Sequence, residues 1–318
     1  MRSFHGWAHR ALVSAAVVAC VAYGSTVSAQ AFPDGKTINL ISWSAAGSPK
    51  DVMARQVAKT LKKQHGWNVV VTDMVGGGGA VALQYLLKQP ADGLNVIAAS
   101  GSLEVALETT LKSSFKASDF DFVSQIQTDP LVLAVAADSP FRSMADLVKA
   151  GKAKPVTISG FGASSAEHLF ASALAKQGGF SMNWLPYSGG SKAVMAAMGH
   201  NADAVLGNLS ESIPLAASGR LRILGAATAE SLTDPKAPSF QSLGYHDAVR
   251  SLWRGFIVKA KTPEADIAAL SKAFAHLTDD PDYVAYTKAS HIQVAYLGPA
   301  DFEKNVQKNM AQVALDLK

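Results

Sequence analysis

The chain alternates short apolar runs with longer stretches in which apolar residues recur every three or four positions. The runs at residues 38–41, 69–71 and 95–99 have the length of buried strands. The stretches at 52–61 and 81–87 have the periodicity of amphipathic helices. This strand–helix–strand order predicts an α/β fold with right-handed crossovers, a parallel sheet and helices on both of its faces.

The same alternation restarts in the second half of the chain. Strands are expected at residues 156–158, 182–185, 204–206 and 221–226, and helices at 168–176, 193–198 and 214–218. Extended apolar runs flank this block at 131–135 and 255–258, and helical stretches follow at 265–277 and 299–317. The pattern predicts two α/β lobes with parallel cores and two crossover strands. Lobe 1 is expected at residues 36–129 and 252–318, and lobe 2 at 130–251.

The first residues have the features of an export signal. Arg2 and Arg10 precede an uncharged apolar run at 11–23, and a small-residue cleavage site ends at Ala29. The run is too short to cross a bilayer, which takes about 20 residues. A signal peptide at residues 1–29 and a periplasmic protein are therefore expected. Lipidation of Cys20 is the alternative, but we favour cleavage after Ala29, which removes this single cysteine.

Charge and composition exclude several classes of function. After removal of residues 1–29 the chain has 27 basic and 25 acidic residues. It has no dense basic stripe of the kind that binds nucleic acid. The expected mature chain has no cysteine, which excludes disulfides and thiolate chemistry. No histidine or acidic cluster has metal-ligand spacing, so neither a metal nor a cofactor is expected.

The candidate chemistry lies where strands are followed by small residues and a capped helix start. After the first strand, Ser48 suits the N-cap, Pro49 the first helical position and Asp51 the third position of a capping box. Free N–H groups at such a helix start bind anions. The small residues before Ser48 would let a ligand approach the backbone. This first junction contains Trp43, Ser44, Ala45, Ala46, Gly47 and Ser48.

Three more junctions have the same construction. They are the glycine run at 76–79, the segment 159–168 with a second expected capping box from Ser164 to Glu167, and the segment 186–191. The glycine run fits a dinucleotide fingerprint formally, but no acidic residue follows the next strand to hold a ribose. In open parallel sheets, ligands bind beyond the carboxyl ends of the strands, where such loops gather. Because none of the four junctions contains an arginine, we expect a carboxylate held by neutral donors and helix ends.

Tests for enzymatic groups give only weak matches. A secreted serine hydrolase would use Ser164 or Ser165 with His168, but the Gly-x-Ser-x-Gly pattern is absent and the serines lie at a helix cap. A histidine inside an amphipathic helix is more often structural. Asp203 precedes a strand, where a turn or cap partner is the simpler reading. No catalytic residue is predicted, and the chain is expected not to be an enzyme.

Several segments together resemble the Bug-type substrate-binding proteins of tripartite tricarboxylate transporters. The likeness covers nearly all of the chain from Lys36 onward, and its order and spacing are more specific than any single motif. It is carried by residues 45–55, 76–79, 90–99, 159–168, 186–190, Asp203, Asn208 with Leu209, and Trp253 with Gly255.

The resemblance implies a periplasmic-binding-protein fold of type II, the Venus flytrap, with a small carboxylate enclosed between the lobes. That carboxylate is expected to be a di- or tricarboxylate, an amino acid or an aromatic acid. It implies a monomer whose partner is the membrane permease of a tripartite transporter. A sensor protein that presents the ligand to a receptor is an alternative with the same fold. The ligand-binding residues expected by position are Trp43, Ser44, Ala45, Ala46, Gly47, Ser48, Gly77, Gly78, Gly79, Ser100, Ser102, Gly160, Phe161, Gly162, Ser164, Ser165, Tyr187, Gly189 and Asn208.

The sequence departs from the family pattern at three places in or beside these loops. The first loop usually begins with proline and an aromatic residue, where this chain has Trp43 and Ser44. Where the family usually has a second glycine in that loop, this chain has Ser48. Where the family usually has an acidic residue before Asn208, this chain has Gly207. Trp43 would either line the pocket and favour a longer or ring-bearing carboxylate, or pack as core, since aromatic residues serve both uses.

Overall fold

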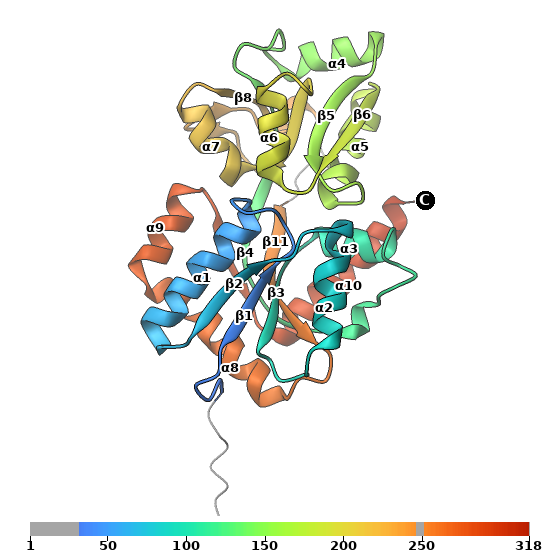
Figure 1. Cartoon of the computed structure of the whole chain (residues 1–318). Coiled ribbons are helices and arrows are strands. Elements are labelled where there is room, and N and C mark those ends of the chain that lie inside the picture. Colours follow the sequence, from blue (N-terminus) through green and yellow to red (C-terminus); the bar gives the residue numbers. More distant parts are fainter. Residues whose placement is uncertain (1–31, 246–250, 318) are drawn as a thin grey trace, which may run out of the picture.

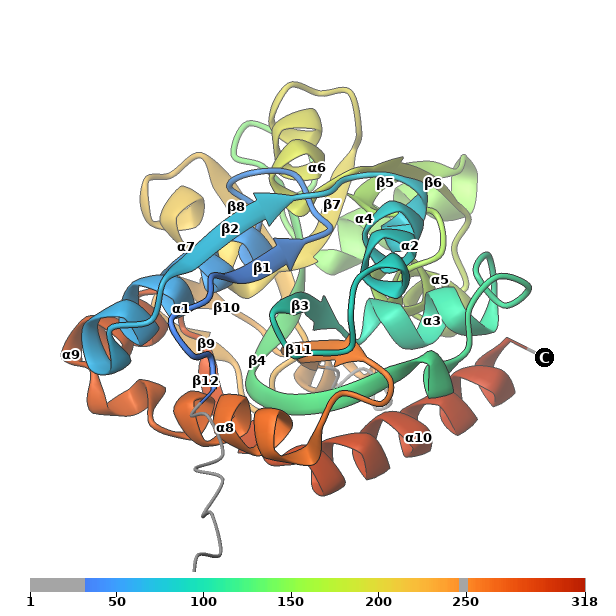
Figure 2. The same ribbon diagram turned by 60° about the horizontal axis from the view of Figure 1, so that its bottom comes forward.

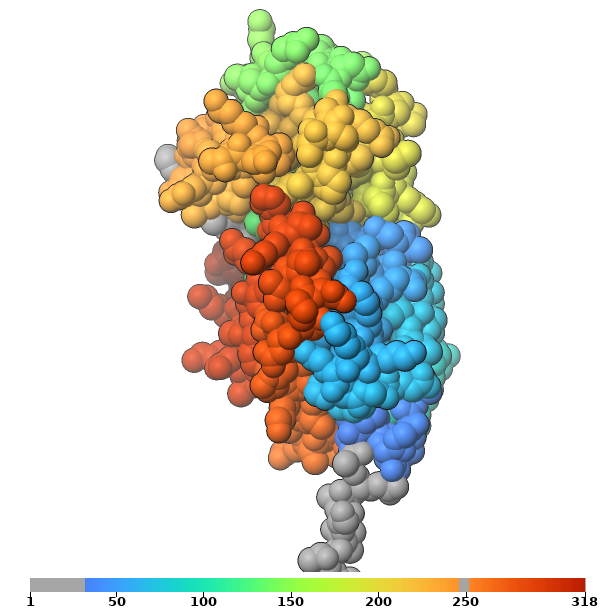
Figure 3. All heavy atoms as spheres, turned by 90° about the vertical axis from the view of Figure 1, so that its left-hand side faces the viewer, coloured from blue at the N-terminus to red at the C-terminus, as the bar shows by residue number. Residues whose placement is uncertain are grey.

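The computed structural model describes residues 32–245 and 251–317. Two lobes lie one above the other and touch along a waist (Figures 1 and 3). The predicted signal peptide and Cys20 lie outside the described residues. Among those that are described, no helix has both the length and the apolar character that crossing a membrane requires.

Lobe 1 has a sheet with a parallel part and an antiparallel part. Its strand order is β2-β1-β3-β11-β4, with β12 also pairing with β4. The strands are β1 (Ile38–Ser42), β2 (Val69–Asp73), β3 (Asn95–Ser100), β4 (Phe120–Ala136), β11 (Ser251–Lys259) and β12 (Gln293–Leu297). The first three are parallel to one another, and β11 runs antiparallel to both β3 and β4.

Helices cover both faces of this sheet (Figure 2). One face carries α1 (Pro49–His65), α8 (Glu264–Ala275) and α9 (Pro281–Ala289), and the other α2 (Ala80–Lys88), α3 (Ser102–Glu108) and α10 (Pro299–Asp316). Met53, Val57 and Leu61 recur every fourth position on α1 and are fully buried against β1. Apolar residues at this spacing form one face of a helix, so burial against the sheet holds α1 in place.

Lobe 2 repeats this construction on a smaller scale. Strands β6 (Met182–Tyr187), β5 (Val156–Phe161) and β7 (Ala204–Asn208) are parallel, and β4 pairs antiparallel with both β7 and β8 (Leu221–Ala226). Two apolar clusters fill the two sides of the sheet. The helices are α4 (Met144–Ala153), α5 (Ala166–Gly178), α6 (Gly190–Met198) and α7 (Leu209–Ala217), and a short hairpin joins β9 (Leu232–Thr233) to β10 (Lys236–Ala237).

The strand β4 runs through both lobes. Over its 17 residues it pairs with β11 as far as Pro130 and with β7 from Leu131 onward. The return passage leads from Tyr245 to β11 through residues outside the described part. Asp129 therefore lies on β4 where its pairing changes from one sheet to the other.

The predicted α/β flytrap fold is confirmed, with differences in its elements. The run at 131–135 is the second half of β4 rather than a separate linking strand, and the run at 255–258 lies inside the sheet of lobe 1. Helix α7 begins at Leu209, five residues before the expected start at 214. The expected elements did not include α3, α4, α9 or β12.

Candidate functional site

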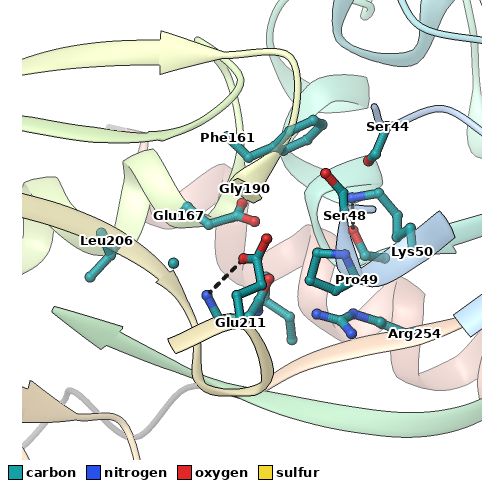
Figure 4. A pocket seen from close by; sticks show the side chains of 14 residues that line it. Ser44, Ser48, Pro49, Lys50, Phe161, Glu167, Gly190, Leu206, Glu211 and Arg254 are labelled. Atoms are coloured by element: carbon teal, nitrogen blue, oxygen red, sulfur yellow. Dashed lines mark hydrogen bonds between the residues drawn. The ribbon is translucent and has the colours of Figure 1, made fainter. Parts of the chain in front are cut away.

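A small, polar cavity lies between the lobes, at the carboxyl ends of strands from both sheets (Figure 4). Its volume is about 10 Å³, close to the space that one water molecule needs. It is lined by Ser44, Ser48, Pro49, Lys50, Ser100, Leu252 and Arg254 from lobe 1, and by Phe161, Glu167, Gly190, Leu206, Gly207, Asn208 and Glu211 from lobe 2.

The two lobes are in direct contact around this cavity. The backbone N–H of Ala45 donates to the carbonyl of Ser188 at 3.3 Å, and the hydroxyls of Ser48 and Ser191 lie 3.2 Å apart. At Gly189, a Cβ atom would lie only 2.4 Å from the Ser48 hydroxyl. The lobes are therefore closed, and glycine at position 189 permits this approach.

The first junction has the expected helix start but not the expected cap. Ser48 is the N-cap of α1 with Pro49 after it, yet the Ser48 side chain makes no capping hydrogen bond. Its hydroxyl faces Ser191 instead, while the Asp51 carboxylate accepts from the backbone N–H of Gly47 at 2.8 Å. The predicted capping box is wrong in both halves, because the serine hydroxyl is used between the lobes and the Ser48 N–H donates to the carbonyl of Ala45 rather than to Asp51.

Lys50 brings a positive charge from α1 into the cavity. Its side chain is buried, its Nζ lies 4.2 Å from the centre of the Phe161 ring and donates to the Ser100 hydroxyl at 3.4 Å. Burial lowers the pKa of Lys50 to about 8, with nearby Glu167 acting in the opposite direction. A buried ammonium with only weak partners is a strong attractor for an anionic group.

The second lobe contributes the start of α5. The N-cap is Ser165, whose hydroxyl accepts from the N–H of His168 at 3.1 Å, so the capping box expected from Ser164 is wrong by one residue. Glu167 is therefore free to face lobe 1, where its carboxylate accepts from the hydroxyl of Ser102 at 2.8 Å.

Glu211 brings a second carboxylate to the cavity from the first turn of α7. Its Oε2 accepts from the N–H of Asn208 at 3.5 Å, and its Oε1 is buried without a hydrogen-bond partner among the described residues. A Cβ at Gly190 would meet this carboxylate within 2.5 Å, so glycine is required there. Burial raises the pKa of Glu211 to about 7, although Arg254 acts in the opposite direction.

Arg254 reaches the cavity from the middle of β11. It is almost fully buried, and its Nη2 donates to Asp129 at 2.5 Å, while Nη1 has no partner among the described residues. Asp129 also accepts from the hydroxyl and N–H of Ser210, at 2.5 and 3.3 Å. This network, made of Asp129, Arg254 and Ser210, ties the crossing strand β4 to both lobes beside the cavity.

The structure brings together only part of the predicted site. Ser44, Ser48, Ser100, Phe161 and Asn208 line the cavity. Others shape the contact between the lobes or the loops behind it: Ala45, Ser102, Gly160, Gly162, Ser165, Tyr187 and Gly189. Ala46, Gly47 and Ser164 are at least partly exposed and are not lining residues of this cavity.

The glycine run and Trp43 lie elsewhere. Gly77 and Gly78 are exposed and do not line the cavity, and Gly79 packs against the Trp43 ring, where a Cβ would come within 2.7 Å. Trp43 is 2% exposed and belongs to the apolar core of lobe 1. Of its two predicted uses, the structure shows packing in the core, and the glycine run supports that packing.

His168 has the structural role that its place in a helix suggested. Its Nδ1 contacts the carbonyl of Ala163 at 2.6 Å, and its ring stacks on Trp184 at 4.8 Å. The Ser165 hydroxyl donates to the carbonyl of Phe161 at 2.5 Å. Asp203 accepts from the N–H of Thr157 at 2.7 Å, as a turn partner does. These contacts do not form a nucleophile–base pair.

Charged side chains are what the sequence analysis missed. We expected neutral donors alone, but Lys50, Glu167, Glu211 and Arg254 all line the cavity. Arg254 lies outside the four junctions, in a strand whose other residues are mainly apolar, and this contrast was the available signal. Within residues 32–245 and 251–317, no group of three metal-ligating side chains is arranged to hold an ion.

A second hollow of about 350 Å³ lies on the other side of Glu211. It is mainly apolar and is formed by both lobes. Its lining residues include Val52, Val194, Met195, Pro214, Leu215 and Tyr286.

Comparisons with known proteins agree with this architecture. Residues 53–315 match the sequence profile described as "Tripartite tricarboxylate transporter family receptor". BugT of Bordetella pertussis is 29% identical over 261 residues, covering 80% of each chain. Two solved structures from Rhodopseudomonas palustris share the fold. MatC with bound malate has a TM-score of 0.82 and 19% identity, and the match covers 89% of this chain and 99% of MatC. Rpa4515 with adipate has a TM-score of 0.82 and 22% identity, and the match covers 88% of this chain and 96% of Rpa4515.

Proposed function

The chain belongs to the tripartite tricarboxylate transporter receptor family, and from this premise we propose that it captures a small carboxylate between its lobes outside the cytoplasm. Members of this family are solute-binding proteins, so the chain is a binding protein and not an enzyme. The loaded form would then deliver its ligand to the membrane permease of a tripartite transporter.

The observation that carries this proposal is the polar cavity between the lobes. Helices α1, α6 and α7 begin beside it, so partial positive charge from their first turns is directed toward one place. Hydroxyl groups of Ser44, Ser48 and Ser100 add donors, and Lys50 adds a full positive charge. The malate and adipate bound by the two similar structures are small carboxylates of the expected class.

Binding requires the lobes to move, because the closed cavity has room for only about one water molecule. The ligand would enter an open form, bridge donors of both lobes and stabilise the closed form.

A thermal-shift screen of mono-, di- and tricarboxylates tests the proposal. A ligand at about 100 times its Kd should stabilise the protein by about 2.7 kcal/mol. The Lys50→Met variant should lose this response, whereas the control Lys62→Met, on the exposed part of the same helix, should keep it. If no carboxylate raises the Tm of the wild-type protein, the proposal is wrong.

The permease step needs a separate experiment. Uptake of the labelled ligand should fall in cells that lack this chain and return when the chain is supplied. Supplying Lys50→Met should restore less uptake than supplying Lys62→Met. Uptake that is the same with and without the chain would remove the transport role and leave only binding.

A further inference from the structure

The charges around the cavity are divided between the two lobes. Lobe 1 contributes Lys50 and Arg254, and lobe 2 contributes Glu167 and Glu211. Figure 4 shows the two carboxylates side by side, with the lysine and the arginine on the opposite side of the cavity. A ligand held between the lobes therefore meets positive charge at one end and negative charge at the other.

The sum of these charges does not favour an anion. Arg254 is neutralised by its contact with Asp129, which leaves the positive Lys50 against Glu167 and, where the pH exceeds its pKa of about 7, against Glu211 as well. A second carboxylate on the ligand would have to lie beside these acids, in a region with little water to screen the repulsion.

Three buried polar atoms around the cavity have no hydrogen-bond partner among the described residues. They are the acceptor Oε1 of Glu211 and the donors Nδ2 of Asn208 and Nη1 of Arg254. Leaving such groups unpaired is costly, so a ligand that pairs all three gains affinity. The acceptor requires an N–H or O–H group on the ligand, and the two donors require oxygen atoms.

We propose that the ligand is an aminocarboxylate: its carboxylate lies toward Lys50 and Arg254 on lobe 1, and its protonated amine toward Glu211 and Glu167 on lobe 2. This inference rests on the proposed function and narrows its ligand class. A primary ammonium group fits better than a trimethylated one, because only the former has N–H groups to donate to Oε1 of Glu211.

Matched ligands separate the amine from the rest of the molecule. Alanine, lactate and propionate share a three-carbon skeleton and carry an amine, a hydroxyl or a hydrogen, respectively, on the carbon next to the carboxylate. Aspartate, malate and succinate form the corresponding four-carbon series. Titration calorimetry on the wild-type protein should show the amino compound of at least one series binding about 30-fold or more tightly than its hydrogen analogue. The hydroxyl analogue should lie between them.

The Glu211→Gln variant supplies a second measurement. It should reduce the preference for the amino compound over its hydrogen analogue by about tenfold or more, and the exposed Glu230→Gln should leave that preference unchanged. If lactate or succinate binds the wild-type protein as tightly as its amino partner, the inference fails and the proposed function stands. If no compound of either series, and no other carboxylate, binds, the proposed function itself fails.

Discussion

The buried carboxyl group of Glu211 should leave a signature in the pH dependence of stability. Burial raises its pKa from 4.5 to about 7 in the folded protein. The folded protein therefore holds a proton that the unfolded chain releases between these two values, and the stability from this group is lost as the pH rises through that window. Glutamine has nearly the same shape and no titration, so Glu211→Gln should not show this loss.

The size of the effect follows from the shift in pKa. Each pKa unit corresponds to about 1.4 kcal/mol, so the whole change is about 3 kcal/mol. Between about pH 5 and about pH 7.5, the difference in unfolding free energy between Glu211→Gln and the wild type should change by about 2 kcal/mol. For a chain of this size, that corresponds to a change of about 3 °C in the difference between their Tm values.

Thermal unfolding of both proteins without ligand, measured across this pH range, provides the assay. The variant should gain stability relative to the wild type as the pH rises. The charged groups that face Glu211, namely Arg254, Asp129, Glu167 and Lys50, are present in both proteins, so their own contributions largely cancel. Glu230→Gln, with an exposed side chain, is the control. Parallel curves for wild type and Glu211→Gln would refute the reasoning.

Three further results are expected. Gly189→Ala places a methyl group against Ser48, so closure should be hindered and ligand affinity should fall by about tenfold or more in calorimetry. Asp129→Asn leaves Arg254 buried without its carboxylate and should reduce the free energy of unfolding in urea by about 3–5 kcal/mol. Trp43→Ala should reduce the free energy of unfolding by about 3–5 kcal/mol in the same assay, because it removes a core side chain. Trp43→Phe should bind carboxylates as the wild type does. A change in its ligand preference would contradict the place of Trp43 in the core.

Much of the fold could be predicted because apolar periodicity records burial. The strands of both parallel sheets and the stripe of α1 came directly from this pattern. The pattern says less where elements are short or half-exposed. Helix α9 has buried positions at Tyr283 and Thr287 but no pronounced apolar face in its sequence, and β12 is largely exposed. Their places depend on tertiary contacts with β4 and α1 that local sequence does not show.

The site was predicted less completely, for a different reason. Strand-to-helix junctions are local, so Ser48, Ser100 and Asn208 could be placed near a shared edge of the sheets. Half of the charged residues of the site lie outside the junction pattern. Arg254 comes from the middle of a strand, and Glu211 from beyond Asn208 in the first turn of the next helix. The glycine run looked like a binding loop because its backbone is bare, but the contact it makes is with Trp43.

The position of Asp129 has a consequence for how ligand preference can change during evolution. Asp129 lies where β4 passes between the lobes, and it holds both Arg254 of the cavity and Ser210 of α7. Substitutions in this trio would alter lobe motion together with ligand recognition, so natural selection acts on both properties at once. Glu167 stands at the start of α5, outside this trio, whereas Glu211 directly follows Ser210 in the first turn of α7. We expect relatives with new ligand specificities to have diverged first at Glu167, while the trio and its neighbour Glu211 drifted more slowly.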